Sequence, residues 1–309
     1  RHGNKMKVGY ANLKRLVDTY KKDIDSAIAE CLKNSWYIKG PAVNTFENKL
    51  SKYCKNSATT CSSGTSALLL AYEHLGIGPG DKVIVPSFTF ISTAEMINKV
   101  GATPIWVDIN MENYTVDIED LQKKMDIHGY DVKAIVGVDC FGHTCDWDSI
   151  KEIADLYCIP VIQDAAQSFG GKYKDKINGS YNLSCLSFYP AKNLFCLGDG
   201  GGVTGPKEDI DSIRMRSDHG RDTKWEHRFL GWNERMDSIQ ANILNKLIPY
   251  IDKWNSDRLR IANIYNDNLN INSTPKTSEW CTHTFNQYTI MATHRDELFD
   301  KLANKGIGC

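Results

Sequence analysis

The feature that most constrains the fold is a series of short apolar runs, rich in β-branched residues, that alternate with helical or turn segments. Runs of this length that are apolar on both faces are typical of strands buried in a parallel sheet. Their alternation with helices predicts an α/β fold with a mostly parallel sheet covered by helices on both faces. The runs are KVIVP (82–86), TPIWVD (103–108), KAIVGV (133–138), IPVIQD (159–164) and CLSFY (185–189).

Helical periodicity predicts amphipathic helices at 16–32 and 43–54, and a third helix that follows the SSG turn and ends near Gly76. A long helical pattern at 234–254, interrupted by Pro249, is followed by polar, asparagine-rich sequence and then by a predicted strand and helix in QYTIMATHRDELFDKLANKG. We therefore predict a large domain at 1–245 and a smaller C-terminal α/β domain at 246–309. The chain stops after a helix and a glycine turn, so we expect the smaller domain to be incomplete.

Charge and cysteine content narrow the function. The 309 residues carry 37 Lys and Arg against 38 Asp and Glu, a formal net charge of −1, so no whole-molecule field favours nucleic acid or an anionic membrane. The ten cysteines include no Cys-x-x-Cys pair, and free thiols in a reducing cytoplasm are the simplest interpretation. No run approaches the ~20 apolar residues of a membrane span. These features favour small-molecule chemistry in the cytoplasm.

Ligands of open α/β sheets bind at the carboxyl ends of the strands, and three candidate groups lie at such places. Ser63, Gly64, Thr65 and Ser66 begin a predicted helix, where free amides and hydroxyls suit a phosphate, although such residues are often only a helix cap. Asp164 ends a strand and is a base, a ligand or a cap. The aromatics of PSFTF, Phe88 and Phe90, follow another strand and are commonly core residues.

The segment LSFYPAKNLFCLGDGGGVTG (186–205) holds the fourth candidate. Lys192 follows an aromatic strand, and an apolar setting would lower the pKa of its amine and make it a nucleophile able to form a Schiff base. Gly200, Gly202 and Gly205 match a Gly-x-Gly-x-x-Gly pattern, but this pattern lies far into the predicted sheet rather than in its first βαβ unit. In this order, the candidates supply a phosphate anchor, an aromatic face, an acid for a ring nitrogen and an amine. A pyridoxal phosphate site needs these parts.

The motifs as a set resemble the DegT-type, or StrS, sugar aminotransferases, which belong to the fold-type I, aspartate-aminotransferase-like enzymes that use pyridoxal phosphate. The resemblance runs from NSWYIKGPAVNTFE to the end of the chain. It is carried by SSGTSALLLA, VIVPSFTFISTA, GATPIWVDI, VGVDCFGHTCDWDSI, PVIQDAAQSFGG, SFYPAKNLFCLGDGG and GWNERMDSIQANIL.

The resemblance implies a role for each matching residue. Lys192 would hold the cofactor and move the proton during catalysis. Asp164 would pair with the ring nitrogen, Gln167 with the ring hydroxyl, and Phe90 would stack on the ring. The phosphate would be held by the start of the helix at Gly64, Thr65 and Ser66, by Ser187, and by Asn233 of a neighbouring subunit, so a homodimer with shared active sites is expected.

The implied reaction transfers an amino group from an amino acid, L-glutamate by expectation, to a nucleotide-linked keto-sugar through pyridoxamine phosphate. The segments SFYPAKNL and KWEHRFLGWNERMD look more like those of enzymes that act at the 3-keto position of the sugar than those of enzymes that act at the 4-keto position. A sugar dehydratase dependent on pyridoxal phosphate is an alternative, although such enzymes replace the lysine that Lys192 provides. A non-catalytic protein and a nicotinamide-binding protein are the remaining alternatives. His143, His219 and His227 lack the spacing of a helix-borne ligand pair, so we predict no metal.

Overall fold

The structure, a computed structural model, describes residues 7–181, 183–270 and 274–309. Within these residues the strands are β1 (Ser57–Cys61), β2 (Lys82–Pro86), β3 (Thr103–Val107), β4 (Val132–Val138), β5 (Val161–Asp164), β6 (Lys172–Tyr173), β7 (Lys176–Ile177), β8 (Leu183–Ser187), β9 (Gly201–Gly205) and β10 (Cys281–Thr282). The helices are α1 (Leu13–Thr19), α2 (Lys21–Asn34), α3 (Pro41–Cys54), α4 (Gly64–His74), α5 (Ser92–Lys99), α6 (Ile118–His128), α7 (Trp147–Leu156), α8 (Lys207–Arg216), α9 (Ser238–Leu247), α10 (Ile251–Asn268) and α11 (Arg295–Asn304).

Seven strands form one mixed sheet in the order β1-β9-β8-β5-β4-β2-β3. Every neighbouring pair from β8 to β3 is parallel, whereas β9 is antiparallel to both β8 and β1. The five apolar runs of the sequence are β2, β3, β4, β5 and β8, so the predicted α/β fold with a mostly parallel sheet is confirmed. A second, three-stranded sheet joins β10 to the β6–β7 hairpin.

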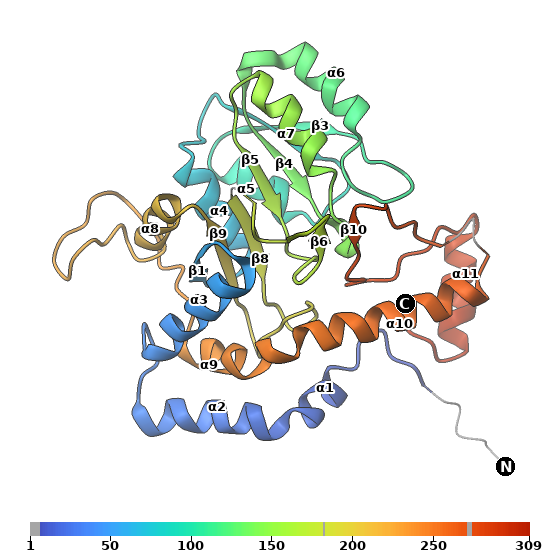
Figure 1. The fold of residues 1–309 in the computed structure, drawn as a ribbon, viewed down its shortest axis with the longest axis horizontal. Helices are drawn as coiled ribbons and strands as arrows, with labels where there is room; N and C mark the ends of the chain where they lie inside the picture. Colours follow the sequence, from blue (N-terminus) through green and yellow to red (C-terminus); the bar gives the residue numbers. More distant parts are fainter. Residues whose placement is uncertain (1–6, 182, 271–273) are drawn as a thin grey trace.

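Helices cover both faces of the main sheet (Figure 1). One apolar cluster joins α4, α5 and α8 to the sheet, through side chains such as Leu70 and Ile97. A second cluster joins α2, α3 and α9 around Phe46 and Leu244, and a third lies under α6 and α7 around Trp147. Parallel strands need cover on both faces, and these three clusters supply it.

The glycine run is strand β9 rather than a nucleotide-binding turn. Residues Gly201–Gly205 pair with β1 on one side and β8 on the other, so the backbone groups of this run serve the sheet. A Cβ atom at position 201 would lie 2.2 Å from the carbonyl oxygen of Ser63, so this strand passes the start of α4 at a distance that only glycine allows. Because the sheet takes up the backbone groups of this run, they are not free to bind a pyrophosphate, which removes the support of the pattern for nicotinamide binding.

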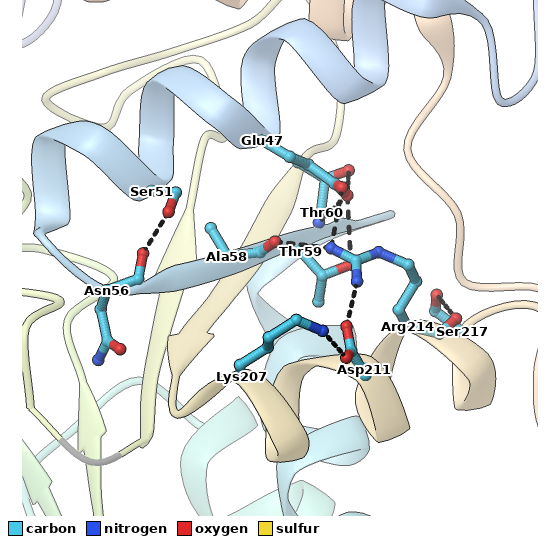
Figure 2. A network of polar contacts seen from close by, with 10 residues as sticks. All are labelled: Glu47, Ser51, Asn56, Ala58, Thr59, Thr60, Lys207, Asp211, Arg214 and Ser217. Atoms are coloured by element: carbon cyan, nitrogen blue, oxygen red, sulfur yellow. Dashed lines mark hydrogen bonds and ion pairs between the residues drawn. The ribbon is translucent and has the colours of Figure 1, made fainter.

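The free edge of β1 is covered by side chains from two helices (Figure 2). Glu47 of α3 accepts hydrogen bonds from the backbone amide and the hydroxyl of Thr60, at 2.8 and 2.9 Å. Arg214 of α8 donates to the carbonyl oxygen of Ala58 at 2.9 Å and to Glu47 at 3.1 Å. An edge strand leaves such groups unpaired, and here an ion pair satisfies them and fixes the strand that leads into α4.

Two local predictions were wrong. The helix predicted at 16–32 is divided by Tyr20 into α1 and α2, and residues 287–292 form no strand, with no partner strand beside them in the described part of the chain. The interruption at Pro249 is confirmed, because a 3-10 turn at Ile248–Tyr250 separates α9 from α10. In Figure 1, α10 extends away from the sheet and α11 lies at its far end. The division into domains at 1–245 and 246–309 stays a prediction.

Candidate active site

A cavity of about 1770 Å³ lies at the carboxyl ends of the parallel strands. Most of the predicted site residues line it: Gly64, Thr65, Phe90, Asp164, Gln167, Ser187 and Lys192. They come from the start of α4, the segment before α5, the ends of β5 and β8, and the loops that follow these two strands. Ser66 and Asn233 do not line it.

The start of α4 forms one wall of the cavity. Ser63 caps the helix, since its hydroxyl accepts the amide of Ser66 at 3.0 Å, and the hydroxyls of Thr65 and Ser92 lie 2.8 Å apart. A Cβ atom on Gly64 would lie 2.8 Å from the Cβ of Ser187, so glycine lets the end of β8 approach the helix closely. The amides of Gly64 and Thr65 are too early in the helix to find an intrahelical acceptor. This wall suits an anion such as a phosphate.

Asp164 ends β5 and is 6% exposed. One carboxylate oxygen accepts the hydroxyl of Thr93 at 2.8 Å, and the other accepts the amide of Ala166 at 3.1 Å. Burial raises the pKa of this carboxyl, while the two hydrogen bonds and the positive charge of Lys192 act in the opposite direction. A buried carboxylate that lines the cavity is suited to bind a cationic ring nitrogen.

Lys192 lies in the turn after β8, where its backbone amide donates to the carbonyl of Tyr189 at 2.8 Å. Burial lowers the pKa of its amine, and the negative charge of Asp164 offsets part of that effect. The amine is therefore neutral more often than that of an exposed lysine, which favours its use as a nucleophile or base. Asp164 ends β5 and Lys192 lies in the turn after the neighbouring strand β8, which explains how residues 28 positions apart share one cavity.

The remaining predicted residues differ in their placement. Gln167 accepts the amide of Phe141 at 2.7 Å, and Phe90 is 66% exposed at the edge of the cavity. Ser66 directs its hydroxyl to Glu234, 2.6 Å away. Asn233 is exposed, and its backbone forms an isolated antiparallel β-bridge with that of Asp218. The part of Ser66 and Asn233 in cofactor binding stays a prediction.

Three residues of this region were not predicted from the sequence. Thr93 binds Asp164, Ser92 binds Thr65, and Glu234 binds two serines at the start of α4. Ser92 and Thr93 lie within the motif VIVPSFTFISTA, and hydroxyls in the first turn of a helix that follows a strand were the available signal. Nothing local marks Glu234, because its partners are about 170 residues away.

The residues fit pyridoxal phosphate. A half-buried lysine, a buried acid and a helix start with free amides face one cavity, and they match the amine, ring nitrogen and phosphate contacts that this cofactor requires. Among residues 7–181, 183–270 and 274–309, no group of three or more His, Cys, Asp or Glu side chains is placed to hold a metal ion. None of the helices that the structure describes is both long and apolar enough to cross a membrane.

The fold and the site together define an aminotransferase that depends on pyridoxal phosphate. The family model for the DegT/DnrJ/EryC1/StrS aminotransferases matches residues 18–309, and the chain belongs to this family.

Named relatives support this assignment. The dTDP-3-amino-3,4,6-trideoxy-alpha-D-glucose transaminase of Streptomyces venezuelae is 34% identical, over 97% of this chain and 80% of that protein. The UDP-2-acetamido-2-deoxy-3-oxo-D-glucuronate aminotransferase of Pseudomonas aeruginosa is 36% identical, over 97% of this chain and 84% of that protein. The crystal structure of NtdA from Bacillus subtilis with bound cofactor PMP has 27% identity and a TM-score of 0.90, covering 99% of this chain and 72% of that one.

Proposed function

We propose that the protein transfers an amino group from an amino acid, L-glutamate by preference, to the 3-keto position of a nucleotide-linked sugar. The observation that carries the proposal is the meeting of Lys192, Asp164 and the start of α4 in one cavity. Two relatives whose names specify the 3-position support this choice. Amination at the 4-position is the second candidate, because not every relative carries the 3-position in its name: the GDP-perosamine synthase of Escherichia coli O157:H7 is also 36% identical, over 90% of this chain and 78% of that protein.

The residues of the chain divide the chemistry among them. When bound, pyridoxal phosphate acts as an electron sink that stabilises negative charge on the carbon next to the amino group. The neutral amine of Lys192 would take the proton from that carbon of the donor and return it to the carbon of the cofactor. Asp164, held by Thr93 and Ala166, would keep a proton on the ring nitrogen of the cofactor. The presence of Lys192 favours amino transfer over dehydration.

The active site is completed by a second copy of the chain. Asn233 is exposed and does not line the cavity of its own subunit, as expected of a residue that reaches a partner. Large apolar side chains in the same segment are also exposed, Trp225 at 82% and Leu230 at 94%. Such side chains are typical of a protein interface. A homodimer would bury them and deliver Asn233 to the phosphate of the neighbouring cofactor.

Spectroscopy of the purified protein with pyridoxal phosphate tests the amino transfer. We expect a visible band of the bound cofactor that disappears when L-glutamate is added and that is absent or shifted in Lys192→Ala. Mass spectrometry and NMR of the products from 3-keto and 4-keto nucleotide sugars then identify the position. A folded, dimeric wild-type protein without the band, or a band that glutamate leaves unchanged, would refute the proposal.

A further inference from the structure

A chain of serine hydroxyls at the start of α4 ends on Glu234. The hydroxyl of Ser66 donates to one carboxylate oxygen of Glu234 at 2.6 Å, and the hydroxyl of Ser62 donates to the same oxygen. Ser63 lies 2.9 Å from the Ser66 hydroxyl and accepts the Ser66 amide at 3.0 Å. The hydroxyls of Ser62 and Ser66 also lie 2.7 Å from each other, so these two groups and the carboxylate share two hydrogens. A carboxylate accepts only, so both hydrogens are held among Ser62, Ser66 and Glu234, and Ser63 can donate to Ser66.

This arrangement commits the side chain of Ser66 to the protein. While its single hydroxyl hydrogen is held by Glu234 or Ser62, Ser66 has no hydrogen to offer a phosphate. The amides of Gly64 and Thr65 remain as donors at this end of the helix. A carboxylate close to a phosphate site is also electrostatically unfavourable for phosphate. If Glu234 favours phosphate binding, it must therefore do so by holding the surrounding residues in position, because its negative charge opposes the binding.

The backbone of Glu234 joins two further segments. Its amide donates to the carbonyl of Ser217, at the end of α8, at 2.9 Å, and its carbonyl accepts the amide of Ser62 at 3.0 Å. Ser62 follows β1 and directly precedes the cap of α4. Asn233, the residue expected to reach the neighbouring subunit, is adjacent to Glu234 in the chain. Glu234 thus connects the start of α4 in its own subunit with the segment that is expected to reach the neighbouring subunit.

We propose that Glu234 is a positioning residue for the phosphate end of the cofactor site. Through Ser62 and Ser66 it fixes the start of α4, and through its backbone it fixes the position of Asn233. It acts on the phosphate of the cofactor and not on the ring, which Asp164 and Lys192 bind. The role concerns cofactor binding, so it holds whichever sugar is aminated.

Comparison of two ligands separates positioning of the phosphate from general stability. Apo protein is titrated with pyridoxal phosphate and with pyridoxal, which lacks the phosphate, and both dissociation constants are measured from absorbance and tryptophan fluorescence. In Glu234→Ala we expect pyridoxal phosphate to bind about 10-fold more weakly, the effect of one charge-assisted hydrogen bond, and pyridoxal to bind as in the wild type. Glu234→Gln keeps an acceptor, so its loss is expected to be smaller.

Glu47 offers a matched control. It is likewise a half-buried carboxylate that accepts two hydroxyls, those of Thr59 and Thr60, but on the outer edge of β1 (Figure 2). Glu47→Ala is expected to lower the melting temperature without changing the ratio of the two dissociation constants. If Glu234→Ala does not fold, Ser62→Ala serves instead, because the side chain of Ser62 does not line the cavity. This variant should raise the ratio of the dissociation constant for pyridoxal phosphate to that for pyridoxal about 3-fold. Equal weakening of both ligands, or tighter binding of pyridoxal phosphate in the Glu234 variants, would overturn the proposal.

Discussion

Two aspartates stand at the carboxyl ends of neighbouring strands, and their surroundings differ. Asp139, directly after β4, is fully buried and accepts hydrogen bonds from the amide of Cys145, the side-chain amide of Gln163 and the hydroxyl of Ser168, at 2.9, 2.7 and 2.8 Å. Asp164, at the end of β5, accepts two hydrogen bonds and lines the cavity. The protein itself satisfies Asp139, whereas Asp164 is left able to bind a ligand.

Residue type and strand position therefore do not identify a ligand-binding acid. Burial raises the pKa of Asp139 to about 7 and also raises that of Asp164, so a shifted pKa does not distinguish them either. Lys192 is among the charges that act on Asp164. The access of Asp164 to the cavity and its lysine neighbour are what separate the functional acid from the structural one.

The largest difference is expected in catalysis. Asp164→Asn removes the charge that keeps the ring nitrogen protonated, and we expect the half-reaction with glutamate to slow about 10²–10³-fold, as for other charges fixed in a buried site. The amide still accepts the hydroxyl of Thr93, so the melting temperature should stay within a few degrees. Stopped-flow spectroscopy measures the rate. A variant that keeps more than a tenth of the wild-type rate would show that Asp164 is as structural as Asp139.

The next difference is expected in stability. Asp139→Ala leaves three buried donors without an acceptor, and we expect the free energy of unfolding to fall by about 2–4 kcal/mol. The dissociation constant for pyridoxal phosphate should change less than 3-fold in the protein that remains folded. Urea denaturation followed by circular dichroism gives the first quantity and absorbance titration the second. An unchanged stability together with lost cofactor binding would reverse the roles assigned to the two acids.

Part of this contrast could be predicted from the sequence. The five apolar runs, the start of α4, Asp164 and Lys192 are all local patterns, and the structure places these residues as the α/β prediction requires. Strands β1 and β9 were missed because SATTC carries threonines toward Glu47 and GGVTG is rich in glycine, so neither has the apolar pattern of a buried strand.

The remaining features depend on contacts between distant parts of the chain. The partners of Asp139 lie up to 29 residues away, and Glu234 is 168 residues from Ser66. The direction of the Ser66 hydroxyl follows from that contact and not from the SSGTS motif. Only tertiary packing could therefore reveal that the protein itself satisfies Asp139 and that Glu234 binds the serines before α4.

The smallest difference is expected in the pH dependence of stability. The pKa of Asp139 rises from 3.8 to about 7 on folding, so the folded protein retains a proton that the unfolded chain releases. This contribution to the free energy of unfolding is fully present below pH 3.8 and is lost as the pH rises through 7. His143 has the opposite sign, because burial lowers its pKa from 6.5 to about 4, and its contribution is lost as the pH falls.

The variant Asp139→Asn isolates the contribution of the acid. Between pH 5 and 7, the free energy of unfolding of the wild type minus that of the variant should fall with rising pH, by at most about 1.4 kcal/mol per pH unit. Because His143 is present in both proteins, its contribution cancels in the difference. The same subtraction for Asp164→Asn should give a slope of the same sign, because burial raises the pKa of Asp164 as well, while Thr93, Ala166 and Lys192 act in the opposite direction. Chemical denaturation at closely spaced pH values measures both slopes, and a flat difference for Asp139 would mean that its three donors hold it ionised throughout.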